Sequence, residues 1–271
     1  MHNPAPGFSA AAASPTGGEC SGRRQRHHTA ATHDCTQPRT ARRQQLGTPR
    51  TCSLSRASEP VAGDCDFGRV VDGKMLTRPV WRLLTVSPHV AESIASVLGT
   101  EPRRRLANGL GRFEVVAEKA NLRVVIENPG RLTTQMKLWD SRGLAHHCDG
   151  RAFLSPEADA GHPCGCPPTM AERRARARAG WGPQPITTLL FRLAECPDIG
   201  SFRFRSSSWR FAEAVERIRT QLAAVGDAAL CELAIQSVEF TTQNGRRVCY
   251  HKPAVNVLDP WASSAALSLA A

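Results

Sequence analysis

Hydrophobic and polar residues follow a regular pattern between about residues 64 and 260. Alternating or β-branched apolar runs predict strands at residues 78–87, 132–140, 186–194, 201–208, 229–242 and 247–257. The last two strands flank a tight turn, QNGR, and so predict a hairpin. Residues 112–130 also predict a hairpin, because two β-branched runs flank the short segment Glu118–Asn121.

Three segments carry helical signals. After the strand at 78–87, Ser87 is a candidate N-cap, Pro88 occupies the first helical position and Gly99 is a stop signal. Residues 168–180 predict a second helix. Residues 207–226 predict a third, whose apolar stripe is Phe211, Val215, Ile218 and Leu222. The expected fold class is therefore α+β: a largely antiparallel sheet, two or three helices and a Cys-rich loop.

The two ends of the chain lack this pattern. Residues 1–62 are rich in Ala, Ser, Thr, Pro, Gly and Arg, and show neither a two-residue nor a helical period. Such a composition cannot bury enough apolar surface to offset its ordering entropy, so we expect a disordered basic tail. Residues 261–271 predict a second, short tail. Between them we expect one domain, residues 63–260, with a Cys-rich insert at 146–180.

Charge limits the function classes without choosing among them. The net charge is +11. The first 62 residues hold eight arginines, no lysine and three acidic residues, so much of this charge lies in the predicted tail. A basic balance attracts nucleic acid or acidic proteins. The folded part is mildly basic, and aromatic residues make up only 6% of the chain.

No apolar run approaches the roughly 18 residues of a membrane-spanning helix, and the N-terminus lacks the apolar core of a secretory signal. We therefore expect a cytoplasmic protein with no membrane contact. Ten cysteines in a reducing compartment favour metal binding or free thiols over disulfides.

The densest group of metal-ligand side chains is the stretch HHCDGRAFLSPEADAGHPCGCP, residues 146–167. Cys148, Cys164 and Cys166 have the spacing C-x15-C-x-C. Thiolates suit zinc, which is tetrahedral and takes four ligands. Glycine at 165 permits the unusual backbone angles that two sulfurs aimed at one ion require. We predict a structural zinc site, because a metal would stabilise a loop rich in Pro and Gly.

The fourth ligand is open on sequence grounds. His162 is our choice, with His147 and Cys196 as alternatives and His146 less favoured. Free thiols in a mobile loop are the competing interpretation. A catalytic zinc is disfavoured, since no His-Glu pair stands at metallohydrolase spacing.

Other motifs give weaker signals. Gly-rich phosphate loops and a G-x-S-x-G nucleophile motif do not occur in the sequence. Ser206–Ser208 is explained by helix capping. The run RRARAR, residues 173–178, fits a solvated helix face or an interaction surface.

The order of these features resembles the recombination directionality factor-like proteins of actinobacterial phages and integrative elements. The resemblance covers about residues 64–258. Its most specific pieces are Cys148–Gly150, Cys164–Pro167 and the block FRLAECPDIGSFRFRSSSW. Some relatives carry a further cysteine after the basic helix, where this chain has Gly182–Pro185.

The resemblance implies an accessory protein without enzymatic activity. It implies binding to a large serine integrase, which then excises the element instead of integrating it. DNA would be contacted indirectly, through the integrase. The competing class is a zinc-containing nucleic-acid-binding protein, supported by the positive charge and the basic helix, whose binding would fall steeply with salt.

Overall fold

The computed structural model describes residues 60–71, 74–107 and 110–262. The predicted N-terminal tail, residues 1–62, lies outside the described residues except for its last three. The predicted C-terminal tail lies outside them except for Trp261 and Ala262. None of the helices in the described segments is long and apolar enough to cross a membrane.

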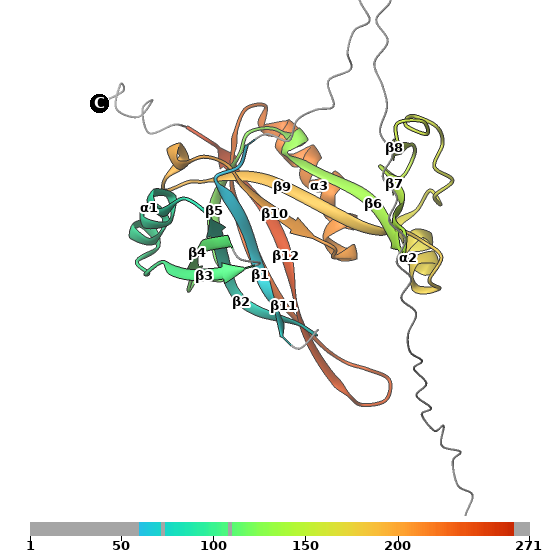
Figure 1. Cartoon of the computed structure of the whole chain (residues 1–271), viewed down its shortest axis with the longest axis horizontal. Helices are drawn as coiled ribbons and strands as arrows, with labels where there is room; N and C mark the ends of the chain where they lie inside the picture. The colour runs from blue at the N-terminus through green and yellow to red at the C-terminus, as the bar shows by residue number, and fades with distance from the viewer. Residues whose placement is uncertain (1–59, 72–73, 108–109, 263–271) are drawn as a thin grey trace, which may run out of the picture. The chain divides into compact units, whose positions relative to one another are not determined.

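The described part of the chain is built mainly from one twelve-stranded sheet (Figure 1). Its order is β12-β11-β5-β9-β10-β1-β2-β4-β3, while β6 pairs with β9 and continues into β7 and β8. The strands are β1 (Gly63–Val71), β2 (Lys74–Thr85), β3 (Arg103–Ala107), β4 (Leu110–Ala117), β5 (Asn121–Ile126), β6 (Leu132–Asp140), β7 (Gly143–Cys148), β8 (Phe153–Ser155), β9 (Gln184–Leu193), β10 (Phe202–Ser206), β11 (Ala229–Thr241) and β12 (Arg247–Pro260).

Strand pairing is antiparallel except between β1 and β10, which run parallel. The described segments also hold three α-helices, α1 (Pro88–Leu98), α2 (Met170–Arg178) and α3 (Trp209–Val225), and two short 3-10 turns, η1 (Pro129–Arg131) and η2 (Pro197–Ile199). The sheet dominates, so the predicted α+β class describes this architecture loosely.

The hairpin predicted at residues 112–130 is wrong in its pairing. Both strands exist, as β4 and β5, but β4 pairs with β2 and β3 whereas β5 lies between β11 and β9. The connection does not turn back on itself because its backbone is held elsewhere. The carbonyl of Ala120 accepts hydrogen bonds from the indole Nε1 of Trp81 and from the amide of Ile235, both at 2.9 Å. Long-range contacts therefore override the local hairpin signal.

The predicted ends of α1 and α3 are confirmed, while α2 is shorter than the predicted 168–180. The side chain of Ser87 caps α1, Pro88 is the first helical residue, and Gly99 ends the helix with a left-handed φ of 65°. In α3, Ser208 accepts a hydrogen bond from the amide of Phe211 and Gly226 ends the helix. These polar caps satisfy backbone groups that the helix itself leaves without partners.

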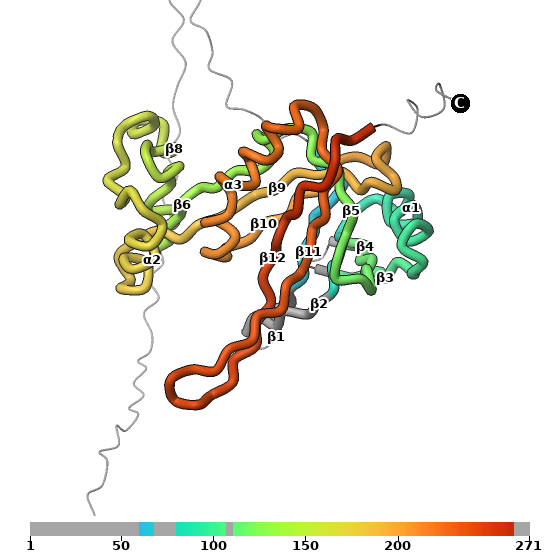
Figure 2. Tube along the Cα trace, turned by 180° about the vertical axis from the view of Figure 1, so that it is seen from behind, coloured from blue at the N-terminus to red at the C-terminus, as the bar shows by residue number. Residues whose placement is uncertain are grey.

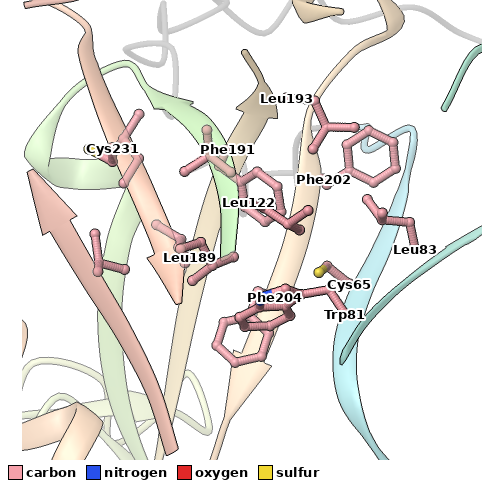
Figure 3. Packing of buried hydrophobic residues seen from close by; sticks show 14 of the residues in the cluster. Cys65, Trp81, Leu83, Leu122, Leu189, Phe191, Leu193, Phe202, Phe204 and Cys231 are labelled. Carbon is pink, nitrogen blue, oxygen red and sulfur yellow. The ribbon is translucent and has the colours of Figure 1, made fainter. Parts of the chain in front are cut away.

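The main core is formed by buried side chains of the sheet together with those of helices α1 and α3. Trp81 packs edge-on against Phe204 and Phe67, with 5.3 Å between ring centroids in each pair. The predicted stripe of α3 is confirmed, since all four of its residues are buried: Phe211, Val215, Ile218 and Leu222. Figure 3 shows side chains from β1, β2, β5, β9, β10 and β11 meeting in this interior.

Charged side chains tie β1, β2, β4 and β3 together. Arg82 contacts Asp66 at 2.5 Å and Glu114 at 2.9 Å, and Arg105 contacts the other oxygen of Glu114 at 2.7 Å. Burial would raise the pKa of Glu114, but hydrogen bonds from Arg105 and Arg82 outweigh it and hold this pKa below its usual value. The buried carboxylate therefore stays ionised between two guanidinium groups.

We expect Leu222→Ala in α3 to lower the free energy of unfolding by about 2–5 kcal/mol, because it leaves a cavity in the main core. The neighbouring Gln221 is exposed, so Gln221→Ala should change stability by about 0.5 kcal/mol or less. Urea unfolding followed by circular dichroism measures both. Equal stability of the two variants would contradict this description of the core.

Candidate metal centre

Four metal-ligand side chains converge at one end of the branch β6-β7-β8. The ligand atoms of His146, Cys148, Cys164 and Cys166 all lie within 4.8 Å of one another. His146 Nε2 is 3.1 Å from Cys148 Sγ and 3.5 Å from Cys166 Sγ, and the two sulfurs are 3.7 Å apart. Residues from a strand and from a separate loop thus share one small volume.

These separations suit a tetrahedral zinc ion. Zn–S bonds of about 2.3 Å and Zn–N bonds of about 2.0 Å place neighbouring ligand atoms roughly 3.5–3.8 Å apart. The distances of 3.5 Å and 3.7 Å lie within that range, and the 3.1 Å between His146 Nε2 and Cys148 Sγ is shorter. Three thiolates and one imidazole are also a ligand set that zinc takes in structural sites. The group can therefore hold zinc with small adjustments of its side chains.

The register of the β6–β7 hairpin positions the first two ligands. Cys148 lies opposite Met136, and His146 lies opposite Leu138. Because side chains alternate along a strand, His146 and Cys148 project from the same face of β7. Met136 is buried beneath them, so this face is turned inward.

The chain returns to supply the other two ligands through a compact loop. The amide of Phe153 donates to the carbonyl of His162, and the amide of Cys164 donates to the carbonyl of Arg151, each at 2.9 Å. These bonds bring Cys164 back beside the end of β7. Gly165 then adopts a φ of 67°, a left-handed conformation that lets both flanking sulfurs face the group.

The structure places His146, and not the predicted His162, with the three cysteines. His162 is exposed and meets the loop through its backbone. His147 projects from the other face of β7, where its two ring nitrogens contact Ser155 and Gln135. Cys196 packs against the main core. The missed signal was the two-residue spacing of His146 and Cys148, which is informative only once 143–148 is known to be a strand.

The hydrophobic core around this group is small. Met136, Cys148 and Cys164 are its buried members, with Phe153, Cys166 and Trp209 packed against them. All seven cysteines of the described residues are free, so disulfides do not stabilise the loop there. A loop with so little apolar burial needs another source of stability, and a bound metal can supply it.

Two arginines of the predicted basic helix contact this loop. Arg173 donates from Nε to the carbonyl of Pro167 at 2.6 Å and from Nη2 to the carbonyl of Gly150 at 2.7 Å. Arg176 donates to the carbonyl of Gly165 at 3.3 Å. Three thiolates, a neutral imidazole and Zn²⁺ would carry one net negative charge, which these guanidinium groups compensate. Part of the basic run is thus structural.

Burial favours the uncharged forms of His146, Cys148 and Cys166 when no metal is bound. It raises the pKa values of the Cys148 and Cys166 thiols. Burial also lowers the pKa of His146, and the nearby charge of Arg176 adds to this effect. The imidazole is therefore neutral and ready to bind a metal near pH 7, while a metal must displace protons from the thiols.

The fold and the cluster together define a sheet protein with a candidate Cys3His metal centre on a branch of its sheet. The chain belongs to the Gp3-like family, whose description is "recombination directionality factor-like" and whose sequence model matches residues 79–258. That range runs from β2 to β12 and includes all four candidate ligands. Membership indicates a role in regulating DNA recombination. No solved structure matches the chain.

We expect about one zinc ion per chain after purification under reducing conditions without chelator. His146→Ala and Cys164→Ser should each remove most of it, because a tetrahedral site loses one of four ligands. The matched controls His162→Ala and Cys196→Ser should keep it. Elemental analysis by mass spectrometry measures all five proteins. Less than about 0.2 zinc per wild-type chain would reject a zinc site.

Arg173 should position the loop without binding the metal. We expect Arg173→Gln to lose zinc to a competing chelator about tenfold or more faster than wild type, since outer contacts of this kind tune metal retention. Arg174→Gln changes a neighbouring charge on the same helix and serves as control. Equal rates for the two variants would show that the contacts of Arg173 do not support the site.

Proposed function

We propose that this protein is a non-enzymatic accessory factor that binds a large serine integrase and switches it from integration to excision. The observation that carries the proposal is the family match across residues 79–258. Excision and integration use the same recombinase, so a factor that reverses the outcome needs no chemistry of its own. It must bind one arrangement of the recombinase better than another.

The metal centre fits a structural role in such a factor. Three cysteines and one histidine would fill all four positions of tetrahedral zinc, leaving none for a substrate or a reacting water. The ion would hold the loop 149–168 against β7 and α2. We therefore infer structural zinc, with catalysis left to the recombinase.

The branch that carries the metal centre also presents large apolar side chains to solvent. Trp139 and Leu144 lie directly opposite each other on β6 and β7, and Trp139 is 66% exposed. Trp181, just after α2, is 80% exposed. Tryptophan is enriched among the residues that dominate protein–protein binding energy. A metal-held branch would keep these side chains in place for a protein partner.

The change needed in the equilibrium between two recombinase arrangements sets the difference in affinity that the factor must have for them. Moving a two-state equilibrium from 1:99 to 99:1 takes about 5.5 kcal/mol of differential affinity, or a ratio of about 10⁴. A protein–protein contact supplies this differential affinity when it forms in one arrangement of the recombinase and is lost in the other. DNA would then be reached through the bound integrase.

Recombination in vitro tests the proposal. Supercoiled DNA carrying the two prophage end sites would be incubated with the large serine integrase encoded nearest to this gene, with and without the full-length protein. We expect excision product only when the protein is present, and less integration on the reverse substrate.

Two results would contradict the proposal in different ways. Unchanged recombination in both directions would reject the directionality role. Retention of the protein alone on DNA, falling steeply with salt, would then favour the nucleic-acid-binding class, because phosphate contacts release counterions.

A further inference from the structure

The hairpin of β11 and β12 extends beyond the strands beside it, as Figures 1 and 2 both show. β5 pairs with β11 from Ala229 to Ala234. Beyond that point β11 and β12 continue to pair with each other, as far as Thr241 and Arg247. We call residues 236–252 the arm. In the described part of the chain, no third strand is hydrogen-bonded to it.

The apolar face of the hairpin changes sides where the arm begins. Within the sheet, Cys231, Leu233 and Ile235 face the main core. The register continues without a shift from Cys231 to the tip, so the same face of the arm carries Glu239 and Thr241. The apolar residues of the arm lie on the opposite face. They are therefore not a continuation of the core.

This opposite face is a compact apolar strip. Val238 pairs across the strands with Tyr250, and Phe240 pairs with Val248. The rings of Phe240 and Tyr250 meet edge-on with centroids 6.3 Å apart. Phe240 is 48% exposed and Tyr250 37% exposed. An isolated two-stranded ribbon is only marginally stable in water, so covering this strip would also stabilise the arm.

The charge of the arm indicates what covers the strip. Residues 236–252 contain Arg246, Arg247 and Lys252 against one acidic residue, Glu239. Arg247 contacts Glu239 at 3.4 Å, which leaves a basic excess beside the strip. A complementary surface is therefore apolar at its centre and carries carboxylates at its rim.

A second copy of this chain fits less well. Two arms would bring like charges together. Edge-to-edge pairing is also interrupted at Pro253, which lies opposite Ile235. The amide of Ile235 donates to Ala120 and so points away from β12. The backbone nitrogen of Pro253 therefore faces the free edge of β12. Because proline has no N–H, it cannot donate a hydrogen bond to another strand there.

We propose that the arm is a docking element for an acid-rimmed apolar surface of the recombinase. This inference rests on the proposed function and adds a contact separate from the metal-bearing branch. Aromatic and arginine side chains concentrated on one ribbon are the composition of a binding hot spot.

The test compares two partly exposed sites on the same hairpin. Phe240→Ser/Tyr250→Ser removes the aromatic strip of the arm. Leu258→Ser changes a residue on β12 outside the arm that is also 48% exposed. Binding of each full-length variant to the large serine integrase encoded nearest to this gene would be measured by biolayer interferometry, with circular dichroism and zinc content as checks on folding.

We expect the double variant to bind about tenfold or more weakly, and Leu258→Ser to bind within about twofold of wild type. Arg246→Glu/Lys252→Glu should slow association and reduce its salt dependence.

The alternatives give different results. Unchanged integrase binding by the double variant, with binding by the wild type, would overturn the inference and leave the proposed function standing. The inference would also be overturned if the double variant still binds the integrase and loses only self-association or retention on DNA. Absence of integrase binding by the wild type would reject the proposed function and the inference together.

Discussion

The branch β6-β7-β8 depends on one constraint. The candidate ligand atoms of His146, Cys148, Cys164 and Cys166 must lie close together. The loop 149–168, which joins β7 to α2 and includes β8, buries little apolar surface, and the core beneath it has three buried members. Backbone hydrogen bonds shape this loop, and Arg173 anchors its two ends to α2. The buried thiols face one another, which is a stable arrangement when a cation lies between them. Zinc in this position would convert a weakly packed loop into a fixed surface.

The sequence was informative where a local signal agreed with the global fold. The caps of α1 and α3 and the buried stripe of α3 follow directly from residue type and spacing. The β11–β12 hairpin also agrees with its turn residues. These features depend on a few neighbouring residues, so their physics is contained within the segment.

Two features depended on distant contacts and could not be predicted in this way. Glu118–Asn121 looked like a turn between paired strands, but Ala120 is held by Trp81 and Ile235, which are far away in sequence. His146, the candidate fourth ligand, could be identified only once 143–148 was known to be a strand. That strand has little apolar alternation, because its inward residues are the candidate ligands His146 and Cys148.

The arm and the branch β6-β7-β8, which carries the candidate metal centre, extend from the same sheet (Figure 1). A partner could contact both the arm and the branch. The well-packed core between them would then fix the positions of the two contacted parts of the partner. In the proposed function, such a pair of contacts lets a non-enzymatic protein favour one arrangement of a recombinase over another. The two contacts would act together, since the second is made at a high effective concentration once the first has formed.

The most direct measurement is the yield of excision with metal-depleted protein, compared with the same protein after zinc is restored. The chelator must be removed before the integrase is added, so that only this protein changes. The account predicts little excision with the depleted protein and recovery to the untreated level after zinc is restored. Full excision by protein shown to contain no metal would contradict the account.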